Sequence, residues 1–181
     1  MNYASLGGDD VNTVSITDVS PEIFRHLLYY LYGGKITDDG LMENARDIID
    51  AADKYGIVGL KLEAEASFVT STTITFENAI DNLLYADATN CALLKEAVLD
   101  FIAENGEEAS KKLSFEHVPG NVIPYLLAAM TKGKRKGNDA NDFSMMRVST
   151  LRKMLHEKGL DIDGSREMMI ARLEESLCLS S

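Results

Sequence analysis

The 181-residue sequence predicts a mostly α-helical protein, and three observations lead to that fold class. Apolar residues recur every three or four positions through most of the chain, as in helices that bury one face. A block of residues repeats after 34 positions, which favours stacked helix pairs. The net charge of −11 is uneven, because residues 1–131 carry −13 and residues 132–181 carry +2. We therefore expect an acidic helical module at 11–131, a basic linker at 132–142 and a helix–turn–helix hairpin at 143–178.

The helical module is expected to open with a short strand and a capped helix. Residues 13–16 alternate polar and apolar side chains, as half-buried strands do. Ser20 suits the cap position of a helix and Pro21 its first turn. Apolar spacing then continues to Leu31, and a glycine pair at 33–34 ends the helix. Six further helices are predicted at 41–55, 60–69, 76–88, 92–103, 107–113 and 122–131.

The internal repeat lies within these helices. At an offset of 34 residues, Glu43-Asn-Ala-Arg-Asp47 recurs as Glu77-Asn-Ala-Ile-Asp81, Ala52-Asp53 as Ala86-Asp87, and Leu60-Lys61 as Leu94-Lys95. Tetratricopeptide repeats share this period, but their aromatic and Gly/Ala pattern is not found in the sequence. We expect two stacked helix pairs instead.

The C-terminal segment predicts two short helices joined by a tight turn. Ser149 is expected to cap the first helix and Gly159 to end it, whereas Gly164 turns the chain and Ser165 caps the second helix. A hairpin of about 30 residues is only marginally stable alone. Its expected core residues are Leu151, Met154, Leu155, Leu160, Ile162, Met169, Ile170 and Leu173.

No arrangement of residues indicates catalysis, and we expect no catalytic residue, metal site or cofactor. The three histidines are dispersed, and no zinc, phosphate-loop or serine-hydrolase motif is found. Cys91 lies at a helix start, where the pKa of a thiol can fall. With two cysteines and no expected signal peptide or membrane span, we expect the nucleus or the cytoplasm. The basic run at 132–136 is either a nuclear-localisation signal or a solvated linker.

The first module resembles a known interaction domain. Residues 14–24, 27–35, 50–56 and Leu60-Lys61 resemble the second half of a BTB/POZ domain, and residues 77–81, 86–87 and 94–102 resemble the helices that follow it in speckle-type adaptors. The resemblance implies protein–protein contacts with other BTB proteins and docking on cullin-3 for ubiquitin transfer. It also implies a strand–helix front half, which we expect to be missing. Leu6-Gly7-Gly8 stands where the family has a hydrophobic residue followed two positions later by Glu.

The C-terminal segment resembles a SAP motif. The framework positions are Val148, Leu151, Leu155, Gly159, Leu160, Gly164, Arg166, Ile170, Arg172 and Leu173. This resemblance implies binding to DNA in the nucleus, with RNA or protein as alternatives in related hairpins.

Candidate nucleic-acid contacts lie on two parts of the hairpin. A helix N-terminus and nearby cations attract phosphate, which favours Ser165, Arg166 and Arg172, while four further cations form a second basic edge. Residues 143–181 nevertheless contain six basic and six acidic residues, so solvated charges or a protein-binding face stay open as alternatives. The seven candidates are Arg147, Arg152, Lys153, Lys158, Ser165, Arg166 and Arg172.

In the first module, Tyr29, Tyr30 and Tyr32 form either an aromatic partner contact or ordinary packing at a helix edge. Together these features predict a non-catalytic adaptor that links a cullin-3 ligase, or another BTB protein, to nucleic acid or chromatin. One alternative is a nuclear DNA-binding protein in which the BTB-like part is only a scaffold. Another is a fragment of a longer gene.

Overall fold

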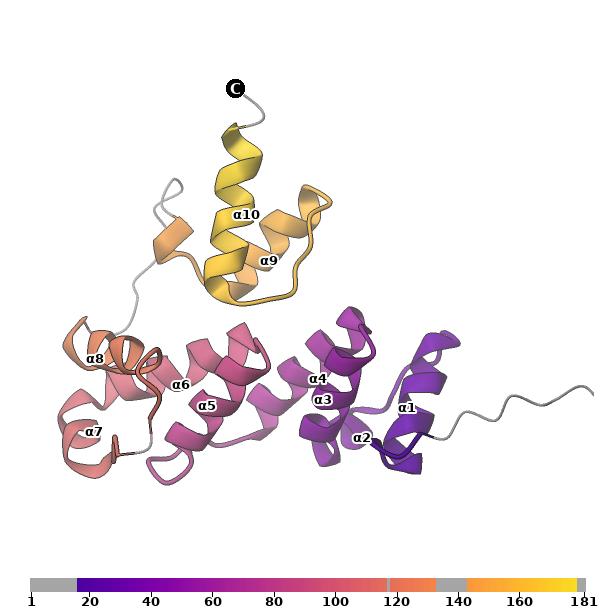
Figure 1. The fold of residues 1–181 in the computed structure, drawn as a ribbon, viewed down its shortest axis with the longest axis horizontal. Helices are drawn as coiled ribbons and strands as arrows, with labels where there is room; N and C mark the ends of the chain where they lie inside the picture. The colour runs from indigo at the N-terminus through magenta and orange to yellow at the C-terminus, as the bar shows by residue number, and fades with distance from the viewer. Residues whose placement is uncertain (1–15, 117, 133–142, 179–181) are drawn as a thin grey trace, which may run out of the picture.

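The computed structural model describes residues 16–116, 118–132 and 143–178, and these residues are helical in the main. In Figure 1 helices α1 to α8 lie in a row, and α9 and α10 stand over the middle of that row. The mostly α-helical prediction is confirmed. The elements are α1 Pro21–Leu31, α2 Asp38–Glu43, α3 Ala45–Lys54, α4 Val58–Ser71, α5 Ala79–Ala88, α6 Ala92–Glu104, α7 Gly106–Lys112, α8 Ile123–Lys132, the 3-10 turn η1 Phe143–Met145, α9 Val148–Glu157 and α10 Arg166–Cys178.

Some expectations fall on residues that the structure does not describe. Three of the four residues of the strand expected at 13–16 lie outside the described part, as do residues 133–142 of the basic linker and the Leu6-Gly7-Gly8 segment. Across the residues that are described, none of the helices combines the length and the apolar character needed to cross a membrane.

Helix α1 begins and ends where its sequence predicts. The Ser20 hydroxyl accepts a hydrogen bond from the Ile23 N–H at 3.3 Å, and Pro21 holds the first helical position. Ile23 and Leu27 are buried, and the chain leaves the helix through Gly33 at φ +83°.

The single helix predicted at 41–55 is wrong, because two helices, α2 and α3, occupy this region. Thr37 caps α2 by accepting a hydrogen bond from the Gly40 N–H at 3.2 Å, so the helix starts before residue 41. The break falls at Asn44, whose side-chain amide donates to the Gly40 carbonyl. Asparagine competes in this way with the helical hydrogen bonds of its own backbone. Its repeat counterpart, Asn78, similarly bonds to the preceding loop, and α5 begins at residue 79 rather than 76.

The 34-residue repeat is a structural repeat. Helices α3 and α4 form one antiparallel pair, and α5 and α6 form the next. The turn within each pair uses a left-handed residue at the equivalent position, Gly56 at φ +68° and Asn90 at φ +55°. In both turns the following residue donates its N–H to the carbonyl five positions back, at 2.8 and 2.9 Å. Glycine and asparagine are the residues that adopt this conformation at least cost.

Each copy of the repeat also contains an ion pair between a buried lysine and an aspartate at the equivalent position. Lys61 bonds to Asp53 at 2.7 Å, and Lys95 bonds to Asp87 at 2.6 Å. Both lysines are more than nine-tenths buried. The repeated Asp and Lys therefore pair within each copy and join its two helices.

The buried side chains form two clusters. The larger cluster runs through the helical module and includes Ile48, Leu60, Leu83 and Leu94, all of them fully buried. The smaller cluster is the core of the hairpin, but it also contains Ala92 from α6. Its members are Ala92, Phe143, Met146, Val148, Leu151, Leu155, Met169 and Leu173, so the hairpin buries its core partly against the helical module.

Of the two helix caps predicted for the hairpin, one is confirmed and the other is wrong. Ser165 caps α10, because its hydroxyl accepts a hydrogen bond from the Met168 N–H at 3.3 Å. Ser149 does not cap α9: Arg147 occupies the cap position, and Ser149 lies within the first turn. Gly159 ends α9 at φ +66°, as predicted.

Candidate functional site

The residues predicted to bind nucleic acid lie in different environments. Lys153 on α9 and Lys158 just after it are exposed, and the Lys153 ammonium is 3.9 Å from Glu157. Ser165 is used as a helix cap. The four arginines are engaged by protein groups, two by the helical module and two within the hairpin.

Arg147 and Arg152 contact carboxylates of the helical module. Arg152 Nη2 lies 2.7 Å from Glu65 Oε2. Arg147 Nε lies 3.3 Å from Glu96 Oε2, and its Nη1 donates to Asp100. Glu65 of α4, with Glu96 and Asp100 of α6, forms what we call the acidic face. Its three side chains are only 1%, 4% and 14% exposed, so the hairpin covers them.

The acidic face also caps two helices. Glu96 Oε1 accepts a hydrogen bond from the Val148 N–H at 3.1 Å, so a residue of α6 caps the N-terminus of α9. Glu65 Oε1 accepts from the N–H groups of Leu93 and Leu94 at 2.8 and 3.2 Å, which caps α6. A carboxylate is favourable at both places, because unpaired N–H groups and the helix dipole make a helix N-terminus positive.

One ion pair between the hairpin and the module has the opposite polarity. Lys61 of α4 bonds to Asp163 in the α9–α10 loop at 3.1 Å, in addition to its bond to Asp53. Burial alone would lower the pKa of Lys61, but the hydrogen bonds to the two carboxylates raise it overall. We call these contacts together the docking interface. It consists of the Lys61–Asp163 ion pair and of the acidic face with its two arginine partners, Arg147 and Arg152.

The charges at the docking interface depend on one another. Burial raises the pKa of Glu96, although Arg147 and the Val148 N–H act in the opposite direction. Burial also opposes the charge of Arg147, but its pKa is raised overall by Asp100 and Glu96. Removing Arg147 would therefore leave Glu96, which is 4% exposed, as a buried charge that water solvates poorly.

Arg166 and Arg172 hold the hairpin together. Arg166 is 9% exposed, and its Nη2 donates to the carbonyls of Met146 and Ser144 at 2.6 and 3.0 Å. Arg172 bonds to the Asp161 carboxylate at 2.9 Å and donates to backbone carbonyls of the α9–α10 loop. Both guanidinium groups thus fix segments that flank α9.

The three candidate tyrosines, which lie in α1 and just after it, differ in their exposure to solvent. Tyr29 and Tyr32 are 57% and 89% exposed, and Leu31 beside them is 61% exposed. Tyr30 is half-buried, and its hydroxyl donates to Glu63 at 3.4 Å. The solvent-facing apolar surface of α1 therefore contains two of the three tyrosines.

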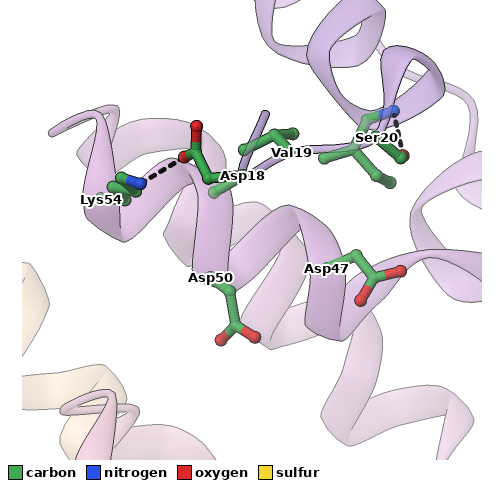
Figure 2. Close-up of a pocket in the computed structure, with 8 residues that line it drawn as sticks. Asp18, Val19, Ser20, Asp47, Asp50 and Lys54 are labelled. Atoms are coloured by element: carbon green, nitrogen blue, oxygen red, sulfur yellow. Dashed lines mark hydrogen bonds and ion pairs between the residues drawn. The ribbon is translucent and has the colours of Figure 1, made fainter. Parts of the chain in front are cut away.

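A hollow of about 300 Å³ lies between α3 and the segment that leads into α1 (Figure 2). Its lining includes Asp18, Asp47 and Asp50, and Lys54 forms an ion pair with Asp18 across it. Asp50 accepts a hydrogen bond from the Tyr85 hydroxyl at 2.8 Å. Within the described ranges, no group of three or more His, Cys, Asp or Glu side chains has the arrangement of a metal site.

Cys91 lies at a helix start, but its thiol does not have the lowered pKa that such a position can give. Cys91 is fully buried at the start of α6. Burial and the nearby Glu65 carboxylate raise its pKa to about 12, so the thiol stays protonated and is a poor nucleophile at neutral pH.

Sequence reasoning missed the acidic face. A signal was present, because Lys61, Glu65 and Glu96 fall on helix faces otherwise occupied by buried apolar residues. Charged residues are almost never fully buried unless they are paired. Such positions predict partners elsewhere in the chain, but spacing does not say which partners they are.

Comparisons with known proteins find two family models that each match a part of the chain. Residues 4–72 match the family model of the BTB/POZ domain, and residues 142–178 match that of the SAP domain. TD and POZ domain-containing protein 4 of Mus musculus is 34% identical over 100 residues, which are 55% of this chain and 26% of the relative. TD and POZ domain-containing protein 3 of Mus musculus is 34% identical over 100 residues, which are 55% of this chain and 27% of the relative. TD and POZ domain-containing protein 1-like of Mus musculus is 34% identical over 95 residues, which are 52% of this chain and 26% of the relative.

The chain thus spans about a quarter of the length of these relatives. The BTB/POZ match covers α1 to α4, and the SAP match covers the α9–α10 hairpin. Residues 4–72 are therefore similar to a BTB/POZ domain and residues 142–178 to a SAP domain, in the order that the motifs predict.

Proposed function

We propose that this chain is a non-catalytic adaptor with a protein-binding helical module at 11–131 and a nucleic-acid-binding hairpin at 143–178, joined by a basic linker at 132–142. The observation that carries the proposal is the presence of a BTB/POZ segment and a SAP domain in one chain. The proposed protein partners are cullin-3 or another BTB protein, and the proposed compartment is the nucleus.

The exposed end of α1 is the proposed protein-binding surface. Tyr29, Leu31 and Tyr32 expose large apolar side chains there. Aromatic residues of this kind contribute a large share of binding energy when a partner covers them.

Replacing Tyr29 and Tyr32 together by alanine is expected to weaken binding of purified cullin-3 about tenfold or more, because two anchors are removed. Calorimetry or surface plasmon resonance measures the affinity. Leu127→Ala is the matched control, since Leu127 is 54% exposed on α8, away from α1. Equal losses in the two variants, or no binding by the unaltered chain, would contradict this assignment of surface and partner.

Nucleic-acid binding is proposed to begin at the exposed cations of α9. Replacing Lys153 and Lys158 by alanine is expected to make the salt dependence shallower. The negative slope of log affinity against log salt loses about 2 in magnitude, about one for each phosphate that a lysine no longer neutralises. The probe is a short A·T-rich DNA duplex, followed by fluorescence anisotropy.

The matched control replaces Lys111 and Lys112 by alanine. These lysines of α7 are also exposed, and each pairs with a glutamate four residues away, as Lys153 does. The control changes the net charge equally but is expected to leave the slope within about 0.5 of the original. A shallower slope in both variants would point to bulk charge rather than to a site on α9. Tighter binding of an RNA of the same length would make RNA the ligand.

A second candidate function is that of a DNA-binding protein whose BTB-like part is only a scaffold. The docking interface favours it, because the helical module caps α9 and completes the hairpin core. The tyrosine experiment separates the two candidates, since a scaffold needs no partner at α1.

A further inference from the structure

The N-terminus of α9 is capped by a carboxylate of the helical module. One Glu96 oxygen accepts the Val148 N–H, and the other faces Arg147 Nε. Arg147 also reaches Asp100. A backbone N–H at a helix start together with an arginine fork is the combination that binds phosphate in proteins. Here a carboxylate of the helical module takes the place that a phosphate would occupy.

The second arginine of the basic edge is occupied in the same way. Arg152 is 14% exposed and is bound by Glu65, which is 1% exposed. Glu65 is itself fixed by two N–H groups at the start of α6. This carboxylate is therefore rigidly placed, so it binds Arg152 with little loss of side-chain entropy on docking.

Docking is supported by further contacts around these charges. Ala92 belongs to the buried core of the hairpin, and Leu93 packs against it. Lys61 holds the α9–α10 loop through Asp163. The orientation of the hairpin on α4 and α6 is thus fixed by apolar packing and by ion pairs of both polarities.

The seated hairpin presents little positive charge to a polyanion. The described segment 143–178 has no net charge; Arg152 is only 14% exposed at the docking interface, and Arg147, though 39% exposed, is paired there with Glu96 and Asp100. Long-range attraction and phosphate neutralisation both require accessible cations.

We propose that the acidic face is an autoinhibitory phosphate mimic, so that Glu65, Glu96 and Asp100 compete with nucleic acid for Arg147 and Arg152. This inference rests on the proposed nucleic-acid function. The closed arrangement keeps affinity low, and DNA binds fully only when the N-terminus of α9 separates from α6. Any event that neutralises the acidic face shifts the chain towards the binding-competent state.

The test uses the full chain with Glu96→Gln and Asp100→Asn combined. Glutamine keeps an oxygen that can accept the Val148 N–H, while the attraction for Arg147 is removed. Affinity for a short DNA duplex at low salt is expected to rise about tenfold or more. A rise of this size follows when the closed arrangement, which dominates the population and competes with DNA, is removed. Asp100→Asn alone, which leaves the Glu96 cap intact, is expected to give a smaller rise in the same direction.

The matched control is Glu107→Gln combined with Glu108→Gln on α7. It removes the same two negative charges from the same module, at exposed positions away from the hairpin. A rise of less than about threefold is expected, because screening weakens distant surface charges. Circular dichroism and thermal unfolding confirm that each variant is folded.

The outcomes separate this inference from the proposed function. If the control raises affinity as much as the test variant, or if neither raises it while the unaltered chain binds DNA through Lys153 and Lys158, competition is refuted and nucleic-acid binding stands. If no form of the chain binds DNA at low salt, the proposed function and the inference both fail.

Discussion

Glu65→Ala is expected to destabilise the protein by about 3–5 kcal/mol, the usual cost of removing one partner of a buried ion pair. The carboxylate is 1% exposed, and it bonds to Arg152 and to two N–H groups at the start of α6. Its removal leaves the Arg152 guanidinium with little access to water and two helical donors without their cap. Urea unfolding followed by circular dichroism measures the change in the free energy of unfolding.

Glu63→Ala is the control for this prediction. Glu63 lies on the same helix but is exposed, and its side chain accepts a 3.4 Å hydrogen bond from Tyr30. Exposed pairs of this kind contribute about 1 kcal/mol or less. Similar losses of stability in the two variants would show that Glu65 is not buried against the hairpin in solution.

Arg166→Ala is expected to destabilise the hairpin by about 3 kcal/mol, because charged hydrogen bonds to buried carbonyls are among the stronger ones. Arg166 ties α10 to the carbonyls of Phe143, Ser144 and Met146. Thermal unfolding and amide hydrogen exchange in α9 and α10 are the measurements.

Lys158→Ala serves as the matched cation control, since Lys158 is exposed at the end of α9. Its effect is expected within about 0.5 kcal/mol. A stable Arg166→Ala variant with lower DNA affinity would instead assign Arg166 to nucleic-acid contact, as its sequence position suggests. If the hairpin of the variant is unfolded, a weak DNA affinity does not assign Arg166 to nucleic-acid contact.

Local signals predicted much of the fold. Ser20 and Ser165 cap their helices because the cap donors lie within three residues in sequence. The repeat also predicted the matching α3–α4 and α5–α6 pairs, and each pair contains its own Asp–Lys ion pair in the structure.

The expectations that failed depend on contacts distant in sequence or on local competition. Ser149 has the right chemistry for a cap, but the α9 N-terminus is capped by Glu96, 52 residues before Val148. The predicted helix at 41–55 is interrupted because the Asn44 side chain replaces a helical hydrogen bond. For the same reason, spacing could nominate Arg147 and Arg152 as cations but could not show that the helical module holds them.

The most direct test of the docking interface is a double-mutant cycle between Glu65 and Arg152. Glu65→Gln, Arg152→Gln and the double variant are compared with the unaltered chain by urea unfolding, so that effects of Glu65 on the α6 cap cancel. We predict a coupling free energy of at least about 1 kcal/mol, as for residues in direct contact. Additivity within about 0.5 kcal/mol would contradict the docked arrangement, and with it the account of how the hairpin is held.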